Sequence, residues 1–282
     1  MNSAFDKSQS PPVMHARGNV DTIGKSCLAD LKIDGELAML TTKNSRLTNK
    51  YGRQRWNCPI TNQPLPDGIF MGELYWQEGK DFFAMLRNKT SDQLKLALWD
   101  VIEFHGENIQ NLPFLIRRRI LESLNLSLCP TNQPLSIVPE WRIETKADLE
   151  ALKTRIFTAG FEGLVLKDPQ STYFEGATIH WAKIKNEIHE VFWVWGYSKQ
   201  AKILSLLIGD DQRPLAHCGS GLTFEEKESV RQVLNQHIIG QTKGDYLVER
   251  RLQIKVKHYG YIRNEAGEVN SLRMPIFEGF QF

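Results

Sequence analysis

The chain has 282 residues, of which 41% are hydrophobic and 24% are charged, and these are ordinary values for a globular protein. No apolar run is long enough to span a bilayer, and the N-terminus lacks the apolar core of a signal peptide, so we expect a soluble, cytoplasmic protein. The four cysteines are scattered without a CxxC pair, which argues against a disulfide framework or a zinc site. The length is long for one domain and sufficient for two.

The net charge of +2 does not by itself indicate a nucleic-acid-binding protein. One stretch, residues 43–55 (KNSRLTNKYGRQR), nevertheless carries five basic side chains and no acid, with Tyr51 among them. Such a stretch suits phosphate groups, although a solvated loop fits it equally well. The three successive arginines at 117–119 are instead expected on the polar face of a helix.

The first part of the chain predicts short strands and two helices. Residues 1–12 are polar and end in two prolines, which predicts an unstructured start, and the overlapping PPVMHAR (11–17) makes a poor strand. Residues 27–40 alternate around an Asp-Gly turn and predict strand, turn, strand. The other expected elements are a loop at 59–68, strands at 69–76, 94–104, 163–167 and 181–185, and helices at 115–126 and 146–158.

After residue 186 the sequence predicts mainly short strands with one helix. Thr223 and Glu226 form a capping-box pattern at the start of a helix predicted over 223–237. Strands are expected at 191–197, 203–208, 252–261 and 271–277, and a small β-barrel with one helix fits this pattern. Residues 187–282 carry 12 basic and 12 acidic side chains, so any nucleic-acid binding there would rest on placed residues such as Lys255 and Lys257.

The chain supplies, in order, each residue type that covalent nucleotidyl transfer requires. A lysine amine must attack an α-phosphate, further cations must hold that phosphate, carboxylates must hold a divalent metal, and an aromatic face must hold the base. Lys32 lies two residues before an Asp-Gly turn, and Lys183 and Lys185 alternate on one predicted strand and so share a face. Each residue alone reads more simply as a surface charge or a core side chain, and only the ordered set favours a site. The set is Lys32, Arg46, Glu73, Trp99, Glu162, Lys167, Lys183 and Lys185.

In this order the motifs resemble those of ATP-dependent DNA ligases in the covalent nucleotidyltransferase superfamily. KIDGE (32–36) resembles the adenylated-lysine motif, and NSR (44–46) resembles the phosphate-contacting motif that follows it. The later matches are IFMGELYW (69–76), LALWDVIEF (96–104), FEGLVLK (161–167) and WAKIK (181–185), together with CGSGLTFEE (218–226) and GEVNSLRMPIF (267–277) in the closing domain.

The resemblance implies an α+β fold with a nucleotidyltransferase (ATP-grasp-like) catalytic domain of antiparallel sheets and helices, followed by a C-terminal OB-fold β-barrel. The expected division is a flexible segment at 1–24, an adenylation domain at 25–186 and an OB-fold domain at 187–282. The protein would then be the minimal two-domain form of such ligases and a monomer that acts on nicked double-stranded DNA without a membrane partner.

The resemblance also implies roles for individual residues. Lys32 attacks ATP to form lysyl-AMP, AMP passes to the 5′-phosphate at a nick, and the 3′-hydroxyl displaces AMP. Asp30 or the backbone at Leu31 reads adenine, and Trp99 stacks on it. The remaining implied roles are Glu73 toward the ribose or a metal, Glu162 toward Mg²⁺, Lys183 and Lys185 on the α-phosphate, Lys167 as a further phosphate contact, and Arg46 on the 5′-phosphate of the nick.

Three positions depart from the family pattern. Asp30 is shorter than the usual glutamate, and Leu37 stands where the family usually has arginine. The final FEGFQF has Gln281 near the arginine of a basic R-x-D-K-type motif, and Arg273 is the nearest basic residue. Three alternatives stay open: an RNA ligase or mRNA-capping guanylyltransferase of the same superfamily, a non-catalytic nucleic-acid-binding protein with a degraded site, and, more remotely, a P-loop ATPase suggested by GKS at 24–26.

Overall fold

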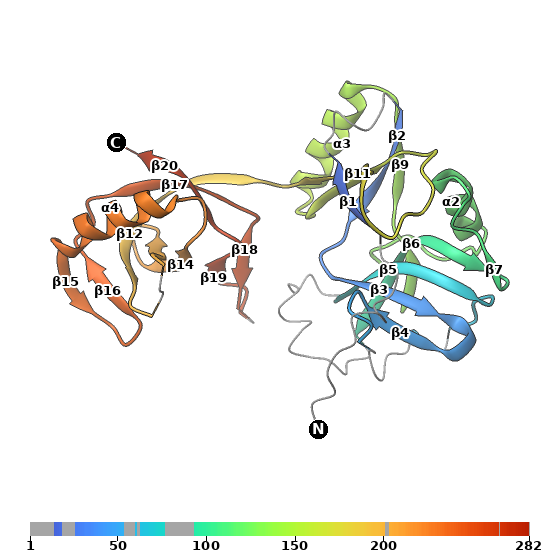
Figure 1. Ribbon diagram of the computed structural model, residues 1–282, viewed down its shortest axis with the longest axis horizontal. Coiled ribbons are helices and arrows are strands. Elements are labelled where there is room, and N and C mark those ends of the chain that lie inside the picture. The colour runs from blue at the N-terminus through green and yellow to red at the C-terminus, as the bar shows by residue number, and fades with distance from the viewer. Residues whose placement is uncertain are drawn as a thin grey trace. The chain divides into compact units, whose positions relative to one another are not determined.

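The computed structural model of the chain describes residues 14–18, 26–53, 60, 63–76, 93–200, 203–264 and 266–281. The predicted unstructured start at 1–12 and part of the predicted loop at 59–68 lie outside these residues. The chain divides into two compact units between Lys185 and Asn186, and each is described here by itself (Figure 1). None of the helices in the described part of the chain is long and apolar enough to cross a membrane.

The described residues of the first unit build two sheets. One has the strand order β1-β11-β10-β2-β9, and the other has the order β4-β3-β5-β6-β7 with β8 beside β6. The strands are β1 (Met14–Gly18), β2 (Cys27–Lys32), β3 (Glu36–Thr41), β4 (Arg46–Asn49), β5 (Gly68–Trp76), β6 (Leu94–Phe104), β7 (Glu107–Asn108), β8 (Leu135–Ile137), β9 (Glu140–Ile143), β10 (Gly163–Lys167) and β11 (Gly176–Lys185). The helices are the 3-10 turn η3 (Thr42–Asn44), α2 (Phe114–Glu122) and α3 (Lys146–Thr158).

Most of the predicted elements of this unit are confirmed. The strands expected at 27–40, 69–76, 94–104 and 163–167 are β2 with β3, β5, β6 and β10, and the strand at 181–185 is the end of β11. Helix α3 has the predicted bounds and begins with a capping box in which Thr145 and Asp148 exchange hydrogen bonds. Helix α2 ends at Glu122, four residues before the predicted end, and Asn125 beyond it has a left-handed backbone with φ of 54°.

Two expectations about the sheets are wrong. The sheets are mixed, because β1 pairs with β11 and β6 pairs with β8 in parallel, whereas antiparallel sheets were expected. Residues 14–18 form a strand where the sequence predicts a poor one. Tertiary contacts override the weak local preference there: the Met14 N–H donates to the hydroxyl of Tyr173 at 3.0 Å, and the Met14 side chain is buried.

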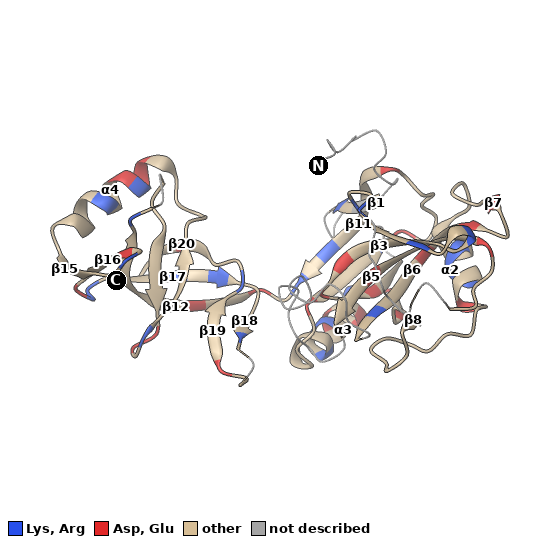
Figure 2. Ribbon diagram, turned by 90° about the horizontal axis from the view of Figure 1, so that it is seen from below, with Lys and Arg blue, Asp and Glu red and all other residues tan. Residues whose placement is uncertain are grey.

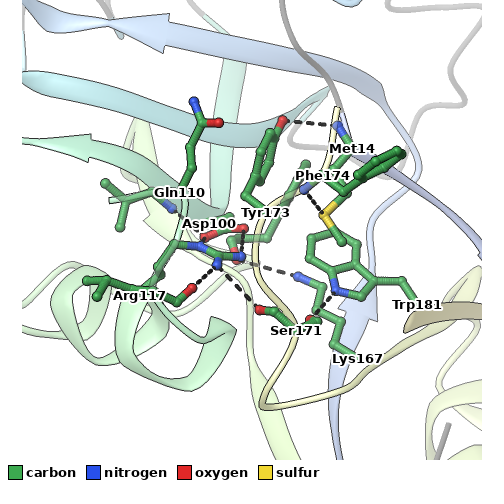
Figure 3. A network of polar contacts seen from close by, with 12 residues as sticks. Met14, Asp100, Gln110, Arg117, Lys167, Ser171, Tyr173, Phe174 and Trp181 are labelled. Carbon is green, nitrogen blue, oxygen red and sulfur yellow. Dashed lines mark hydrogen bonds and ion pairs between the residues drawn. The ribbon is translucent and has the colours of Figure 1, made fainter. Parts of the chain in front are cut away.

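The arginine run at 117–119 also corrects the sequence interpretation, which placed all three side chains on a polar face. Arg117 and Arg118 are 0% and 1% exposed, and only Arg119 points to solvent. Arg117 donates from Nε and Nη2 to the two carboxylate oxygens of Asp100 on β6, each at 2.8 Å (Figure 3). Figure 1 shows α2 beside β6, the strand that carries Asp100.

The second unit, within the described residues, has one main sheet and a small one of β18 with β19. In the main sheet, β12 pairs with β13 along one edge and with β17 and then β16 along the other. The elements are β12 (Ile188–Ser198), β13 (Leu206–Gly209), β14 (Pro214–Cys218), α4 (Phe224–Asn235), β15 (Ile238–Gln241), β16 (Asp245–Val248), β17 (Gln253–His258), β18 (Tyr261–Arg263), β19 (Val269–Leu272) and β20 (Ile276–Gln281).

The predicted helix of this unit is confirmed as α4, with the capping box of Thr223 and Glu226 in place. The strand expected at 271–277 is broken, because Met274 between β19 and β20 has a left-handed φ of 50°. Strand pairing among the described residues does not close the sheet into a barrel. The expected barrel is therefore not seen as such.

We predict that Arg117→Gln lowers the free energy of unfolding by about 3–5 kcal/mol, because it leaves the buried Asp100 carboxylate without its partner. Arg119→Gln, two residues along the same helix, should change it by no more than about 0.5 kcal/mol, since that side chain is exposed. Denaturant titration of both variants measures the difference. Equal values for the two variants would contradict the assigned role of Arg117.

Candidate active site

Strand alternation places the candidate lysines on one face of the first sheet. Asp30 on β2 lies opposite Val165 on β10, and Val165 lies opposite Lys183 on β11. Side chains two positions apart in a strand share a face, so Lys32 projects on the same side as Asp30, and Lys185 on the same side as Lys183. The opposite face is apolar and packs against α3 through one cluster that includes Ala29, Leu31, Leu164, Leu166, Leu149, Leu152 and Ile156.

The turn after Lys32 carries the chain from the first sheet to the second. A Cβ atom added to Gly35 would lie 2.2 Å from the carbonyl oxygen of Leu74 and 2.9 Å from Cγ of Glu73. No side chain fits in that space, so a glycine is required for the turn to pack against β5. The close approach brings Glu73, on the second sheet, to the end of β2, where Lys32 stands.

Lys32 forms an ion pair with Glu162, with Nζ 2.6 Å from Oε2 and side-chain exposures of 17% and 8%. Glu162 directly precedes β10, whose first residue Gly163 lies opposite both Lys32 and Lys185. A Cβ atom at Gly163 would lie 1.9 Å from the carbonyl oxygen of Ile184. Gly163 therefore lets β10 lie tightly against β11, and Glu162 directly before it contacts Lys32.

Burial and neighbouring charges shift two pKa values beside this pair. Burial raises the pKa of Glu73 to about 8, with Glu162 and Asp34 adding to the rise and with Lys32 and Lys183 opposing it. Burial also lowers the pKa of Lys183, and the nearby charges of Lys32 and Lys185 lower it further. Acids and amines with shifted pKa values in one cavity are typical of a functional site.

Lys32, Glu73 and Lys183 line a cavity of about 850 Å³, which falls within the usual size range of ligand pockets. Its charged walls come from both sheets and its apolar walls include Trp99 and Trp181, whose ring centroids are 5.4 Å apart. The predicted site residues on its lining are Asp30, Leu31, Lys32, Glu73, Trp99, Lys167 and Lys183. Leu31 turns its side chain into the core, and its N–H donates to the carbonyl oxygen of Pro139 at 3.0 Å.

Lys167 lies deeper in the wall than a phosphate-binding lysine would. It is 2% exposed and forms an ion pair with Asp30. Its ammonium lies 4.8, 4.4 and 4.3 Å from the ring centroids of Trp99, Phe114 and Trp181. Burial lowers the pKa of Lys167, and the Asp30 carboxylate opposes that shift. This placement favours a role in holding Asp30 over direct contact with a phosphate.

A polar network lies behind the cavity wall (Figure 3). The Trp181 indole N–H donates to the hydroxyl of Ser171 at 3.3 Å, and the Phe174 N–H lies 3.4 Å from the sulfur of Met14. Arg117 Nη1 donates to the carbonyl oxygen of Leu112 at 2.5 Å. These contacts join β1, the segment before β11 and α2, and they hold the apolar wall of the cavity in place.

Some predicted residues lie elsewhere, and some lining residues were not predicted. Arg46 is exposed at the start of β4, and neither it nor Lys185 lines the cavity. Lys50 and Tyr51 of the basic stretch do line it, with Nζ of Lys50 4.9 Å from the Tyr51 ring centroid. The sequence signal that points to a phosphate-binding role for these two residues is the aromatic Tyr51 among basic side chains. The acids Glu36 and Glu175 also line the cavity. Glu36 is the last residue of the KIDGE motif, whereas no sequence pattern marks Glu175.

The donor set fits a single hard cation. Glu73 and Glu162 are close enough that the charge of one shifts the pKa of the other. The described residues contain no cluster of three His, Cys, Asp or Glu side chains that could hold a metal without further ligands. Mg²⁺ takes one or two carboxylates and completes its shell with water and phosphate oxygens, so Glu73 on the cavity wall and Glu162 beside Lys32 suit it.

A protein family and a curated relative match this chain. The family described as "ATP dependent DNA ligase domain" matches residues 16–185. Among curated proteins, the "DNA ligase" of Natronomonas pharaonis is 28% identical over 198 residues, which cover 66% of this chain and 35% of that protein. The chain thus spans about a third of the length of this curated relative.

Two solved structures share the fold. "Pmar-Lig_PreS3" has a TM-score of 0.70 at 16% identity and covers 95% of this chain and 67% of that chain. The structure named "DNA binding with a minimal scaffold: Structure-function analysis of Lig E DNA ligases" has a TM-score of 0.67 at 17% identity and covers 90% of this chain and 92% of that chain. At these identities the likeness shows the fold alone.

The raised pKa of Glu73 predicts how stability depends on pH. In the unfolded chain this carboxyl loses its proton near pH 4.3, whereas the folded protein keeps the proton up to about pH 8. The contribution of Glu73 to stability is therefore fully present below about pH 4.3 and falls as the pH rises through this window. Glu73→Gln should make this fall of stability with rising pH less steep, while Glu150→Gln at an exposed position of α3 should not. Denaturant unfolding at several pH values measures the slopes, and equal slopes for wild type and Glu73→Gln would refute the assignment.

Proposed function

Since the chain belongs to the ATP-dependent DNA ligase family, whose domain matches residues 16–185, we propose that it seals nicks in duplex DNA with ATP, through a lysyl-AMP intermediate on Lys32. The observation that carries the proposal is the Lys32–Glu162 contact of 2.6 Å at the edge of a cavity that Glu73 and Lys183 also line. Such a set holds a nucleophile, a cation for phosphate and carboxylates for a metal within one site.

In the first step, Nζ of Lys32 forms a bond to the α-phosphorus of ATP, and pyrophosphate leaves with the electrons of the broken P–O bond. The attack requires a neutral amine, and Glu162 Oε2 is positioned to accept the proton. In the second step a 5′-phosphate oxygen attacks the same phosphorus, and the P–N bond breaks to return Lys32. In the third step the 3′-hydroxyl attacks the 5′-phosphorus, loses its proton and displaces AMP.

The Asp30 carboxylate favours adenine over guanine as the bound base. Its Oδ2 is occupied by Lys167, whereas its Oδ1 is buried and has no hydrogen-bond partner among the described residues. A fixed acceptor suits the amino group of adenine and repels the carbonyl oxygen that guanine carries at the same position. Trp99 lines the same cavity and offers a face for stacking. This arrangement favours a ligase over a capping guanylyltransferase.

The other groups have supporting roles in the proposal. Lys183 holds the α-phosphate, with Lys185 beside it, and Arg46 contacts the 5′-phosphate of the nick. Glu73 and Glu162 would hold Mg²⁺, which when bound neutralises phosphate oxygens. We assign residues 25–186 to adenylation and 187–282 to an OB-fold domain that binds the duplex, after a flexible segment at 1–24. The protein would act as a cytoplasmic monomer.

We predict that wild-type protein becomes covalently labelled by ATP that carries ³²P at the α-phosphate, and that Lys32→Ala does not, because the substitution removes the amine that is proposed to attack the α-phosphorus. The protein is first treated with pyrophosphate to remove any AMP already bound. Lys153→Ala on α3, which removes a lysine that does not line the cavity, is the matched control and should label normally. Absence of label on pretreated wild-type protein would refute the proposal.

Substrate choice is tested with the same preparation. A duplex with a nick in DNA should be sealed, and the same duplex with RNA at both sides of the nick should be sealed poorly. GTP should not replace ATP, since Asp30 offers only an acceptor to the base. Preferential sealing of the RNA nick would favour the RNA ligase alternative.

We predict that labelling requires Mg²⁺ and that Glu162→Gln raises the Mg²⁺ concentration for half-maximal labelling by about tenfold or more, because one carboxylate ligand is lost. Glu73→Gln should act in the same direction. Glu150→Gln, an exposed acid on α3, serves as the control and should leave the requirement unchanged. An identical Mg²⁺ requirement in all three variants would remove both glutamates from the metal site.

A further inference from the structure

The second unit contains a smaller hollow that the proposed chemistry does not use. It has a volume of about 310 Å³ and lies between α4, the end of β12 and the β15–β16 hairpin. Its polar lining includes Tyr197, Lys199, Arg231, Asn235 and Tyr246, and Ser198 and Ile238 complete it. None of these lining residues is acidic, although acidic and basic side chains are interspersed elsewhere along this unit (Figure 2).

Arg231 is the informative side chain of the hollow. Its Nε is buried and has no hydrogen-bond partner among the residues that the structure describes. A buried N–H without an acceptor is costly, and such groups are rare unless a ligand or water completes them. The guanidinium also reaches Tyr197 electrostatically, since it opposes the rise that burial causes in the pKa of that phenol.

Lys199 adds a second positive charge, and the groups that its ammonium contacts are neutral. Its ammonium donates to Oε1 of Gln241 at 2.6 Å and to the carbonyl oxygen of Thr242 at 2.7 Å, and it lies 4.9 Å from the ring centroid of Tyr246. In the described part of the chain no carboxylate forms an ion pair with Lys199 or Arg231. The hollow therefore keeps both charges.

The other side chains around the hollow leave hydrogen-bond donors available. The rings of Tyr197 and Tyr246 are 5.3 Å apart and form one side of the hollow. The Tyr197 hydroxyl donates to Oδ1 of Asn235, which fixes the amide and leaves its NH₂ group as a donor. A guanidinium, an ammonium and an amide NH₂ around a small hollow form a donor set that matches a tetrahedral oxyanion.

We propose that this hollow is an anion site that takes a phosphate group. The group is either a backbone phosphate of nucleic acid or free inorganic phosphate, and the two share the same chemistry. The balanced charge of residues 187–282, with 12 basic and 12 acidic side chains, means that phosphate binding there must come from such placed residues. The site stands independently of nick sealing, since it shares no residue with the cavity around Lys32.

The test is NMR of the full chain labelled with ¹⁵N-arginine, which resolves the Nε–Hε signal of each arginine. The Arg231 signal is identified by its loss in Arg231→Lys. Inorganic phosphate and a short duplex DNA are titrated separately, with chloride at matched ionic strength as the reference. We expect a saturable shift of the Arg231 signal with phosphate. A shift with DNA as well identifies a backbone phosphate as the source, and a shift with phosphate alone identifies a free anion.

Two results would overturn the proposal: an Arg231 signal that does not shift with either probe, or one that shifts without saturation in step with chloride. A second arm uses Lys199→Gln, which should weaken phosphate binding by about tenfold, because one charged hydrogen bond is lost. Lys227→Gln removes the same charge from α4 outside the hollow and should leave the Kd unchanged. Equal affinity in the two variants would also overturn the proposal.

Discussion

The ion pair between Lys32 and Glu162 is the contact on which the rest of the candidate site depends. It exists because β2 and β10 are paired so that Lys32 lies opposite Gly163. A shift of that register by one residue would turn Lys32 into the apolar cluster under α3 and bring Leu31 to the cavity face. The apolar face of the sheet, through its burial, therefore decides which residues form the polar site.

Two glycines make the contact possible at the level of the backbone. Gly35 lets the turn after Lys32 press against β5, and Gly163 lets β10 approach β11 without a side chain between them. Because the turn and β10 both pack this closely, Glu73 and Lys183 lie near Lys32 and Glu162, and their pKa values are shifted. The electrostatics of the cavity thus follow from two positions where the backbone tolerates no Cβ atom.

A second layer of buried charge supports the cavity from behind. Trp99 and Asp100 are consecutive on β6, where a bulge shifts the register of β6 against β5. Trp99 lines the cavity, while Asp100 is held by two hydrogen bonds from Arg117. Lys167 and Asp30 form a similar buried pair next to it. Such pairs are costly to break because either partner alone would leave an unmatched charge, so they fix the position of the cavity wall that carries Trp99.

The sequence allowed the strands around the site to be predicted because their patterns are local. Alternation and the Asp-Gly turn identified β2 and β3, the amphipathic spacing of Leu149, Leu152 and Ile156 identified α3, and a capping-box pattern supported α4. Interactions between distant segments could not be read in this way. Strand β1 forms through its pairing with β11. Arg117 is buried because it pairs with Asp100 on β6, a residue that lies 17 positions earlier in the chain. Glu175 reaches the cavity from a segment without any motif.

We propose that the sheet register makes Lys32, and no neighbouring lysine, the nucleophile. The most direct test is peptide mapping by tandem mass spectrometry of pyrophosphate-treated protein after incubation with ATP and Mg²⁺. We expect one adenylyl group, attached through nitrogen to Lys32. An adenylyl group on Lys183, Lys185 or another residue, with Lys32 unmodified, would contradict it.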